Sequence, residues 1–180
     1  MIESKYLKTN IQNIQQLLTI PALKNFETRN LGKLLSLSKI RKYADGEIII
    51  REGDLDSWLY FILSGKIVIK KDGVEIGSIS KSGEIFGEMR IIDNQSRSAS
   101  VYAEGETVCL AIDTSARNRM PGDPEENKDE RLDFLLHLYR IFSEYMSSRL
   151  RLTNEELIKT KKELRKTKER LYKKDRKVWE

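Results

Sequence analysis

Two charged residues nine positions apart have the types and spacing needed to hold a sugar phosphate. Glu88 follows Gly87 in a segment that reads as about one helical turn, and Arg97 stands at the start of the next apolar run. Backbone N–H groups at such a turn attract anions, and the planar fork of an arginine donates two parallel hydrogen bonds to phosphate oxygens. A carboxylate repels phosphate, so Glu88 is better suited to accept a hydrogen bond from a hydroxyl of the same ligand.

The rest of the composition offers little other chemistry. The 180 residues include one cysteine, Cys109, one histidine, His137, and no Cys-x-x-Cys pair. The chain therefore lacks a set of nitrogen and sulfur ligands for zinc or iron and a histidine-based triad, so we expect no metal site, no cofactor and no enzymatic activity. No apolar run approaches the roughly 18 residues that span a bilayer, and the start of the chain does not read as a signal peptide. These features predict a cytoplasmic protein that does not enter membranes.

The elements that would position Glu88 and Arg97 are strands. Within residues 43–116, short β-branched and aromatic runs alternate with glycine-containing turns. Such spacing without intervening helices predicts an antiparallel sandwich, roll or jelly roll. The predicted strands are 47–51, 58–64, 66–70, 74–80, 98–103 and 107–112, with turns that include Ser64-Gly65 and Glu104-Gly105. Residues 84–95 interrupt this rhythm, and such interruptions often carry function.

The two flanks of the strand region are predicted to be helical. Residues 1–42 form the N-terminal helical region, because apolar residues recur at helical spacing on both sides of Pro21. Residues 117–128 are predicted to be a linker, and residues 129–180 a long C-terminal helix. Leucines at 150, 157, 164 and 171 recur every seventh residue, with threonines at 153, 160 and 167 in the companion positions. This heptad pattern predicts a coiled coil, with a second copy or a different protein as its partner.

The positive charge of the chain is concentrated in its tail. The net charge is +5 overall, but +6 over residues 151–180 and −1 over the first 150 residues. Because the basic residues alternate with glutamates, we interpret the tail as the solvated face of a coiled coil and not as a nucleic-acid-binding segment. A DNA-binding tail remains a weaker hypothesis.

Residues 86–103, which read Phe-Gly-Glu-Met-Arg-Ile-Ile-Asp-Asn-Gln-Ser-Arg-Ser-Ala-Ser-Val-Tyr-Ala, resemble the phosphate-binding cassette of cyclic nucleotide-binding domains. The resemblance extends from about Leu18 to Ala111 and includes the segments 43–47, 51–54 and 59–65. It is to the type found in catabolite activator protein and in the regulatory subunit of protein kinase A. It implies a double-stranded β-helix, that is, a jelly-roll-like β-roll, followed by a long C-terminal helix. Because a charged heptad helix follows the matching residues here, we expect no helix-turn-helix domain.

The resemblance also implies roles for individual residues. Glu88 would bond the ribose 2′-hydroxyl, Arg97 would pair with the cyclic phosphate, and Ser98 would help to complete the cradle. The residues expected to contribute backbone contacts are Gly87, Met89 and Ala99. In the family a residue of the C-terminal helix stacks over the base, and Tyr139 and Phe142 are the candidates here, with core or dimer packing as their alternative role. Arg90 stands where the family usually has alanine or glycine, and we interpret it as a solvated helix residue.

These observations predict a non-enzymatic sensor. It would bind cAMP or cGMP and transmit binding through its C-terminal helix as a homodimer, to a protein effector. The alternative is a scaffold that keeps the fold, binds no nucleotide because Arg90 obstructs the cradle, and presents a dimerising helix.

Overall fold

The computed structural model describes residues 1–5, 7, 15, 17–18, 20, 23–24, 28–115 and 128–176. They divide into two compact units, Met1–His137 and Leu138–Glu180. The elements in chain order are β1 (Ile2–Glu3), α2 (Thr28–Ser36), β2 (Ser38–Tyr43), β3 (Ile48–Ile50), β4 (Trp58–Lys71), β5 (Val74–Ile79), β6 (Ile85–Phe86), α3 (Met89–Asp93), β7 (Ser100–Asp113) and α4 (Lys128–Arg176).

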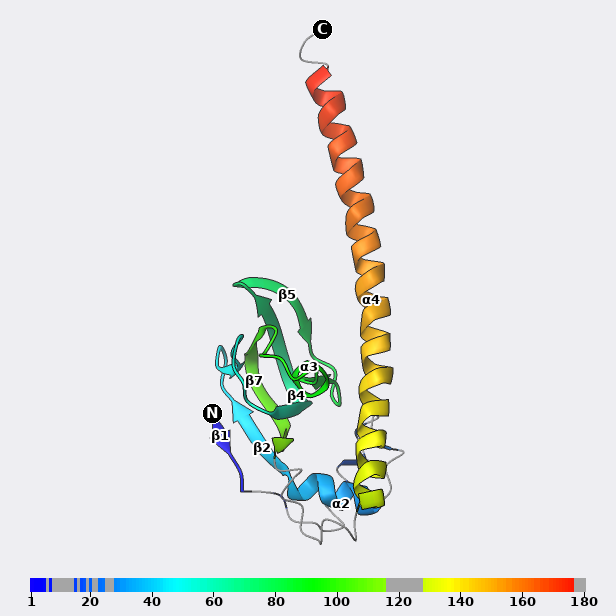
Figure 1. Cartoon of the computed structure of the whole chain (residues 1–180). Helices are drawn as coiled ribbons and strands as arrows, with labels where there is room; N and C mark the ends of the chain where they lie inside the picture. The colour runs from blue at the N-terminus through cyan, green and yellow to red at the C-terminus, as the bar shows by residue number, and fades with distance from the viewer. Residues whose placement is uncertain are drawn as a thin grey trace. The chain divides into compact units, whose positions relative to one another are not determined.

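The first unit is built around one antiparallel sheet that curls on itself (Figure 1). Its strands lie in the order β1-β2-β7-β4-β5, while β3 pairs with β7 and β6 pairs with β4. Strands β4 and β7, each 14 residues long, pair along nearly their whole length and form the spine of the roll. The predicted fold class, a mainly β roll followed by a long C-terminal helix, is confirmed.

Alternate residues of these strands point into an apolar cluster inside the roll, as the two-residue period of a strand requires. Thirteen buried residues form the cluster: Tyr43, Ile49, Ile50, Tyr60, Ile62, Ile67, Ile69, Ile79, Phe86, Val101, Ala103, Cys109 and Ala111. Phe86 directly precedes the segment that carries the candidate site, and its ring stacks on that of Tyr60 with centroids 4.9 Å apart. The start of the candidate site is therefore anchored in the core.

Two predicted turns are wrong in the structure. The segments around Gly65 and Gly105 were expected to reverse the chain, but each lies inside a continuous strand, β4 and β7 respectively. The β4–β7 register shifts on both sides of Ser64, and Gly65 adopts a φ of +91°. The glycine therefore allows a bulge that bends the strand, which turn-like sequence signals do not distinguish from a chain reversal.

The boundary of the predicted N-terminal helical region is also wrong. Helix α2 lies within residues 1–42, and its Leu31, Leu34 and Leu35 are fully buried, as predicted. However, β1 and β2 lie within the same range, so the sheet begins before residue 43. Strand β2 reads as polar because it carries four Ser, Lys and Arg residues among six, yet it is paired on both sides, by β1 and β7. The predicted linker 117–128 lies almost wholly outside the described residues.

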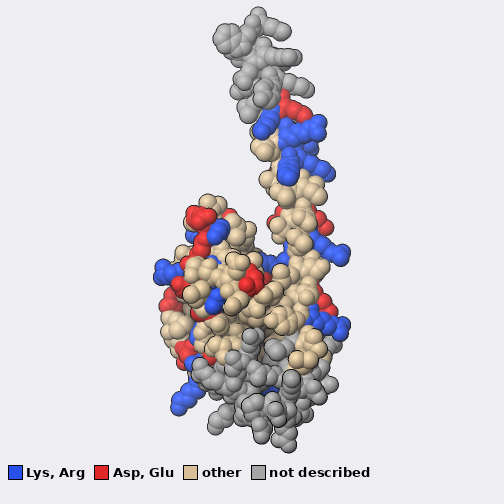
Figure 2. Space-filling view, viewed as in Figure 1, with Lys and Arg blue, Asp and Glu red and all other residues tan. Residues whose placement is uncertain are grey.

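Helix α4 is one continuous helix of 49 residues (Figure 1). Its first residue, Lys128, is one position before the predicted start, so the predicted C-terminal helix is confirmed, while the coiled coil stays a prediction. Lys and Arg side chains gather toward the C-terminal part of α4 (Figure 2). No helix in the described part of the chain is both long and apolar enough to cross a membrane.

Candidate ligand-binding site

The candidate site is the segment that joins β6 to β7. After Phe86 the chain passes Gly87, runs through the single helical turn α3, and leaves it at Asn94, which adopts a left-handed conformation with φ of +56°. The next backbone anchor is Arg97, whose N–H donates to the carbonyl of Asp54 and whose carbonyl accepts from the N–H of Gly53, both at 2.9 Å. Two hydrogen bonds to the loop after β3 therefore fix the position at which the Arg97 side chain leaves the backbone.

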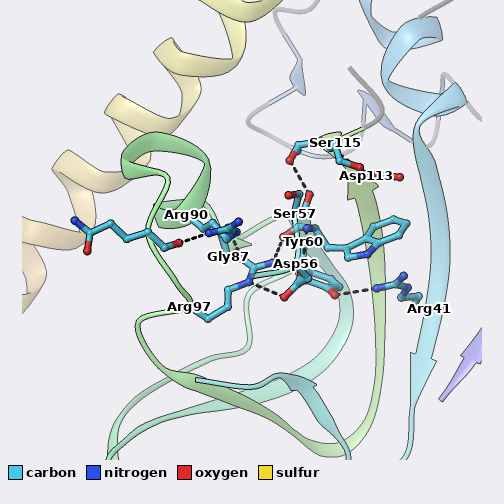
Figure 3. Close-up of polar contacts among 12 residues, drawn as sticks. Arg41, Asp56, Ser57, Tyr60, Gly87, Arg90, Arg97, Asp113 and Ser115 are labelled. Atoms are coloured by element: carbon cyan, nitrogen blue, oxygen red, sulfur yellow. Dashed lines mark hydrogen bonds and ion pairs between the residues drawn. The ribbon is translucent and has the colours of Figure 1, made fainter. Parts of the chain in front are cut away.

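The Arg97 side chain is buried, with only 3% of its surface exposed, and is held by protein acceptors (Figure 3). Nε donates to Asp56 Oδ2 at 3.0 Å and Nη2 to Asp56 Oδ1 at 2.5 Å, which is the bidentate geometry of a strong pair. Nη1 donates to the carbonyl of Gly87 at 2.7 Å, and Nη2 also donates to the carbonyl of Trp58. The arginine thus joins the cassette to the start of β4.

Asp56 was not among the residues singled out from the sequence. Its Oδ1 also accepts the N–H of Trp58 at 3.1 Å, the local turn that an aspartate makes before a strand. That local signal is readable in a sequence, but the pairing with Arg97 spans 41 positions and depends on how the roll closes. Burial by itself raises the pKa of the Asp56 carboxyl, but the hydrogen bonds and charge of Arg97 outweigh burial and lower that pKa below its ordinary value.

The lowered pKa of Asp56 predicts a loss of stability in acid. A carboxylate whose folded-state pKa lies below its unfolded value stabilises the fold above the unfolded pKa, about 4, and this contribution disappears as the pH falls through the folded pKa. We expect the difference in free energy of unfolding between the wild type and Asp56→Asn to shrink as the pH is lowered from 6 to 3. Urea denaturation across this range measures it, and a pH-independent difference would contradict the assigned role of the Asp56 charge.

Gly87 is required by the closeness of Arg97. Its φ is +80°, and a Cβ at this position would lie 2.8 Å from Nη1 of Arg97 and 3.2 Å from the carbonyl oxygen of Trp58. Any side chain would therefore push the guanidinium away from the Gly87 carbonyl, besides straining the backbone.

The other predicted site residues lie along the same segment. Glu88 directly precedes α3 and is buried, with 5% of its surface exposed, whereas Met89 is 46% exposed. Ser98 is exposed and its Oγ lies 3.5 Å from Met89 Sδ. Ala99 is partly buried and packs against the core cluster. The structure thus gathers the six predicted residues in one cassette, and their roles toward a ligand stay predictions.

Arg90 is not the freely solvated residue that we expected. Its side chain is partly buried and folds back along the cassette, where Nη1 donates to the carbonyl of Gln95 at 2.6 Å (Figure 3). Its Nε is buried without a hydrogen-bond partner. The reason is geometric, because the left-handed turn at Asn94 brings the carbonyl of Gln95 within reach of α3. Arg90 therefore braces the cassette from within.

A second arginine supports the site from the opposite side of Trp58. The Arg41 guanidinium lies 3.8 Å from the centroid of the Trp58 ring, a cation–π contact, and its Nη1 donates to the Tyr60 hydroxyl at 2.9 Å. Glu3 of β1 pairs with Arg41 Nε at 2.6 Å. Burial raises the pKa of Tyr60, so its hydroxyl stays neutral beside the arginine. The sequence did not point to this cluster, because its members come from three different strands.

The candidate base-capping residues lie on α4. Tyr139 is 39% exposed and Phe142 is buried, and their rings meet edge to face with centroids 6.3 Å apart. Both belong to the second unit, and capping of a base stays a prediction. Among the described residues, no group of three or more histidine, cysteine, aspartate or glutamate side chains is arranged to hold a metal ion.

The comparisons with known proteins point to one family. Residues 40–120 match the family model described as "Cyclic nucleotide-binding domain". The chain is 40% identical over 108 residues to the cAMP-dependent protein kinase type II regulatory subunit of Drosophila melanogaster, and 31% identical over 114 residues to the cGMP-dependent protein kinase 2 of Homo sapiens. These alignments cover 57% and 60% of this chain but only 28% and 15% of the two relatives.

The fold agrees with a solved relative. A cyclic nucleotide-binding domain from Methylobacillus flagellatus superimposes with a TM-score of 0.63 at 23% identity, covering 78% of this chain and 79% of that one. At 23% identity, this likeness shows that the chain shares the fold of that domain. Residues 40–120 are thus similar to a cyclic nucleotide-binding domain, and the aligned part of the chain is similar to parts of a cAMP-dependent and a cGMP-dependent protein kinase protein.

Proposed function

We propose that this protein is a sensor that binds cAMP or cGMP in the cassette between Phe86 and Ala99. Arg97 holds the cyclic phosphate, Glu88 accepts a hydrogen bond from the ribose 2′-hydroxyl, and the small residues Ser98 and Ala99 leave room for the phosphate. The protein performs no chemistry on the ligand. Its output is a change in the C-terminal helix that a protein effector reads.

The acceptor set of Arg97 is the observation that supports this proposal. The edge formed by Nε and Nη2 is held by the Asp56 carboxylate, while Nη1 donates to the carbonyl of Gly87. An incoming cyclic phosphate therefore competes for Nη1 with a neutral carbonyl and not with a carboxylate. A phosphate oxygen carries a negative charge that the carbonyl lacks, so the guanidinium attracts it more strongly and the exchange favours the ligand. Asp56 keeps the guanidinium oriented throughout.

Ligand binding should stabilise the fold. A ligand present at 100 times its Kd stabilises the native state by about 2.7 kcal/mol, which raises the Tm of a domain of this size by several degrees. We expect this increase with millimolar cAMP or cGMP and not with 5′-AMP, whose open phosphate carries more charge and lacks the ring. Ser98 suits either base, so the sequence does not predict which nucleotide is preferred. At equal concentrations the nucleotide that binds more tightly raises the Tm more, so the larger increase identifies it.

The scaffold is the second candidate function, and one observation favours it. Arg97 already has a complete structural role, since Asp56, Gly87 and Trp58 all accept hydrogen bonds from it. The same buried arginine could therefore maintain the roll without a ligand. Superimposable melting curves with and without both cyclic nucleotides would support the scaffold and rule out the sensor.

In both cases the C-terminal helix is the element that acts on other molecules. We propose that it forms a homodimer, because the described part of α4 carries exposed leucines, Leu150, Leu157 and Leu164 among them. The same composition that excluded a membrane segment predicts a cytoplasmic protein. Sedimentation at tens of micromolar protein tests the dimer, and a monomer under these conditions would contradict it.

A further inference from the structure

Seven of the nine large exposed apolar side chains described on α4 follow one seven-residue register, while Leu152 and Ile158 lie outside it. With Leu150 assigned to position a of the repeat abcdefg, Leu136, Leu157 and Leu164 also occupy a. Position d holds Leu132, Tyr139 and Met146, and then Thr153, Thr160 and Thr167. The exposed fractions of the apolar members are 57% for Leu132, 61% for Leu136, 39% for Tyr139, 38% for Met146, 62% for Leu150, 49% for Leu157 and 55% for Leu164. We call this row of a and d residues the α4 seam. It begins at Leu132 and is therefore longer than the heptad leucines at 150, 157, 164 and 171 suggest.

The seam is distinct from the buried positions of the same helix. Ile141 and Phe142 are buried, and they occupy positions f and g of the repeat. From Leu132 to Thr167, the a and d positions of the helix carry apolar residues, apart from three threonines and one serine. These exposed apolar residues need a partner helix to cover them. The register continues in the sequence to Leu171.

The charges beside the seam identify that partner. Positions g and e flank the a and d residues, and in a parallel pair g of one helix lies next to e of the following heptad on the other. From Leu150 onward this rule pairs Glu156 with Lys161, Glu163 with Lys168, and Arg170 with Asp175. All three combinations join opposite charges, and each occurs twice in a symmetric pair.

An antiparallel pair of the same helices is less favourable. There, e positions flank e positions and g positions flank g positions, so every alignment brings at least one pair of like charges together, even where Arg170 or Asp175 meets an opposite charge. Like charges in such positions are destabilising. The charge pattern is therefore self-complementary and favours the parallel direction.

The threonines of the seam are compatible with this arrangement. The Thr167 hydroxyl donates to the carbonyl of Glu163 in its own helix at 3.0 Å. A hydroxyl satisfied in this way leaves no unpaired polar group when the residue is covered, and its methyl group is available for packing. Threonine packs less well than leucine, so the distal seam is weak and relies on its charges for direction.

We infer that residues 150–171 pair with the same segment of a second copy of this chain, parallel and in register. This inference rests on the proposed homodimer and adds its direction and its alignment. The occupant of the exposed α4 seam is thus neither a nucleic acid nor an unrelated helix.

Single cysteine substitutions test the direction of the pair in the full-length protein. In a parallel, in-register dimer, residue 153 faces residue 153 of the partner and residue 167 faces residue 167, so Thr153→Cys and Thr167→Cys should each form a disulfide-linked dimer under mild oxidation. Lys162→Cys at the outward position f is the matched control and should stay uncrosslinked. The native Cys109 is fully buried, and burial raises its pKa to about 12. It therefore stays protonated and should not form crosslinks of its own.

Charge reversal tests the partner. Glu156→Lys/Glu163→Lys converts four attractive contacts of the dimer into repulsive ones and should weaken dimerisation on the order of tenfold or more. Mixing this variant with Lys161→Glu/Lys168→Glu should restore association, because opposite charges then meet again. Dimers of equal strength in all three samples would overturn the inference.

These outcomes separate the pairing from the proposed function. Cyclic nucleotide binding is measured on the same variants by the increase in Tm. Crosslinking at only one of positions 153 and 167, or at neither, overturns the parallel in-register pair even where nucleotide binding is intact. Crosslinking at both, without any response to cyclic nucleotides, supports the pair while contradicting the sensor.

Discussion

Replacing Arg97 with alanine should weaken cyclic nucleotide binding by about 2 to 5 kcal/mol, which is some 30-fold to several thousand-fold in Kd. The reason is that the phosphate would lose its only predicted side-chain cation in a site that is largely shielded from water. Glu88→Ala should cost less, because it removes a contact to a neutral hydroxyl. Isothermal titration measures both, and exposed Arg51→Ala is the control for loss of a positive charge from the same domain.

The same substitution should lower the free energy of unfolding by about 1 to 3 kcal/mol, because it leaves the Asp56 carboxylate partly buried without its partner. The double variant Asp56→Ala/Arg97→Ala removes that stranded charge and should recover much of the stability without recovering binding. Unchanged affinity in Arg97→Ala would refute the assignment. A larger loss of affinity in Arg90→Ala than in Arg97→Ala would show that Arg90 is the phosphate partner.

Gly65→Ala should be among the most destabilising single-methyl substitutions in the roll, at about 3 kcal/mol or more. At a φ of +91° the new Cβ would lie 2.5 Å from the carbonyl oxygen of Glu106 and 2.7 Å from the Cα of Thr107. Both atoms are backbone of β7, so they cannot move without disturbing the longest strand pair. The left-handed conformation itself costs a non-glycine residue about 1 to 2 kcal/mol, and the contact adds to it.

Gly73→Ala separates these two contributions. Gly73 also has a positive φ, +78°, but a Cβ there meets nothing within 4 Å. We expect it to lose only the conformational part, about 1 to 2 kcal/mol. Chemical denaturation of both variants measures the difference, and equal losses would mean that the bulge at Gly65 tolerates a side chain.

The cassette could be predicted from the sequence because its elements are local. Gly87, Glu88 and Arg97 lie within eleven consecutive residues, so their spacing alone brings them together, and the structure places them on one segment. Asp56 escaped prediction because its partner lies 41 residues away and is reached only once the roll is closed. The identity of a long-range partner depends on sheet topology, which local patterns do not contain.

Strand limits were predictable where β-branched or aromatic runs stand between turn residues. Strand β5 was predicted from Val74 to Ser80 and is observed from Val74 to Ile79. Strand β2 was missed because Lys39, Arg41 and Lys42 make it look like an exposed segment. Arg41 is nevertheless 8% exposed, because Glu3, Tyr60 and the Trp58 ring together satisfy its charge. A charged residue in a core is compatible with folding only when such partners exist, and they come from other strands.

The position of Trp58 gives the domain an optical signal of its own. Its carbonyl accepts a hydrogen bond from Arg97, and its indole ring lies under the Arg41 guanidinium. The chain contains only one other tryptophan, Trp179, so Trp179→Phe leaves a single emitter beside the cassette. Indole emission is sensitive to a nearby cation. Because Arg97 is hydrogen-bonded to the carbonyl of Trp58, any shift of Arg97 toward a ligand changes the surroundings of Trp58. Fluorescence of the unlabelled protein therefore reports on the cassette directly, in real time and at concentrations far below those needed for calorimetry.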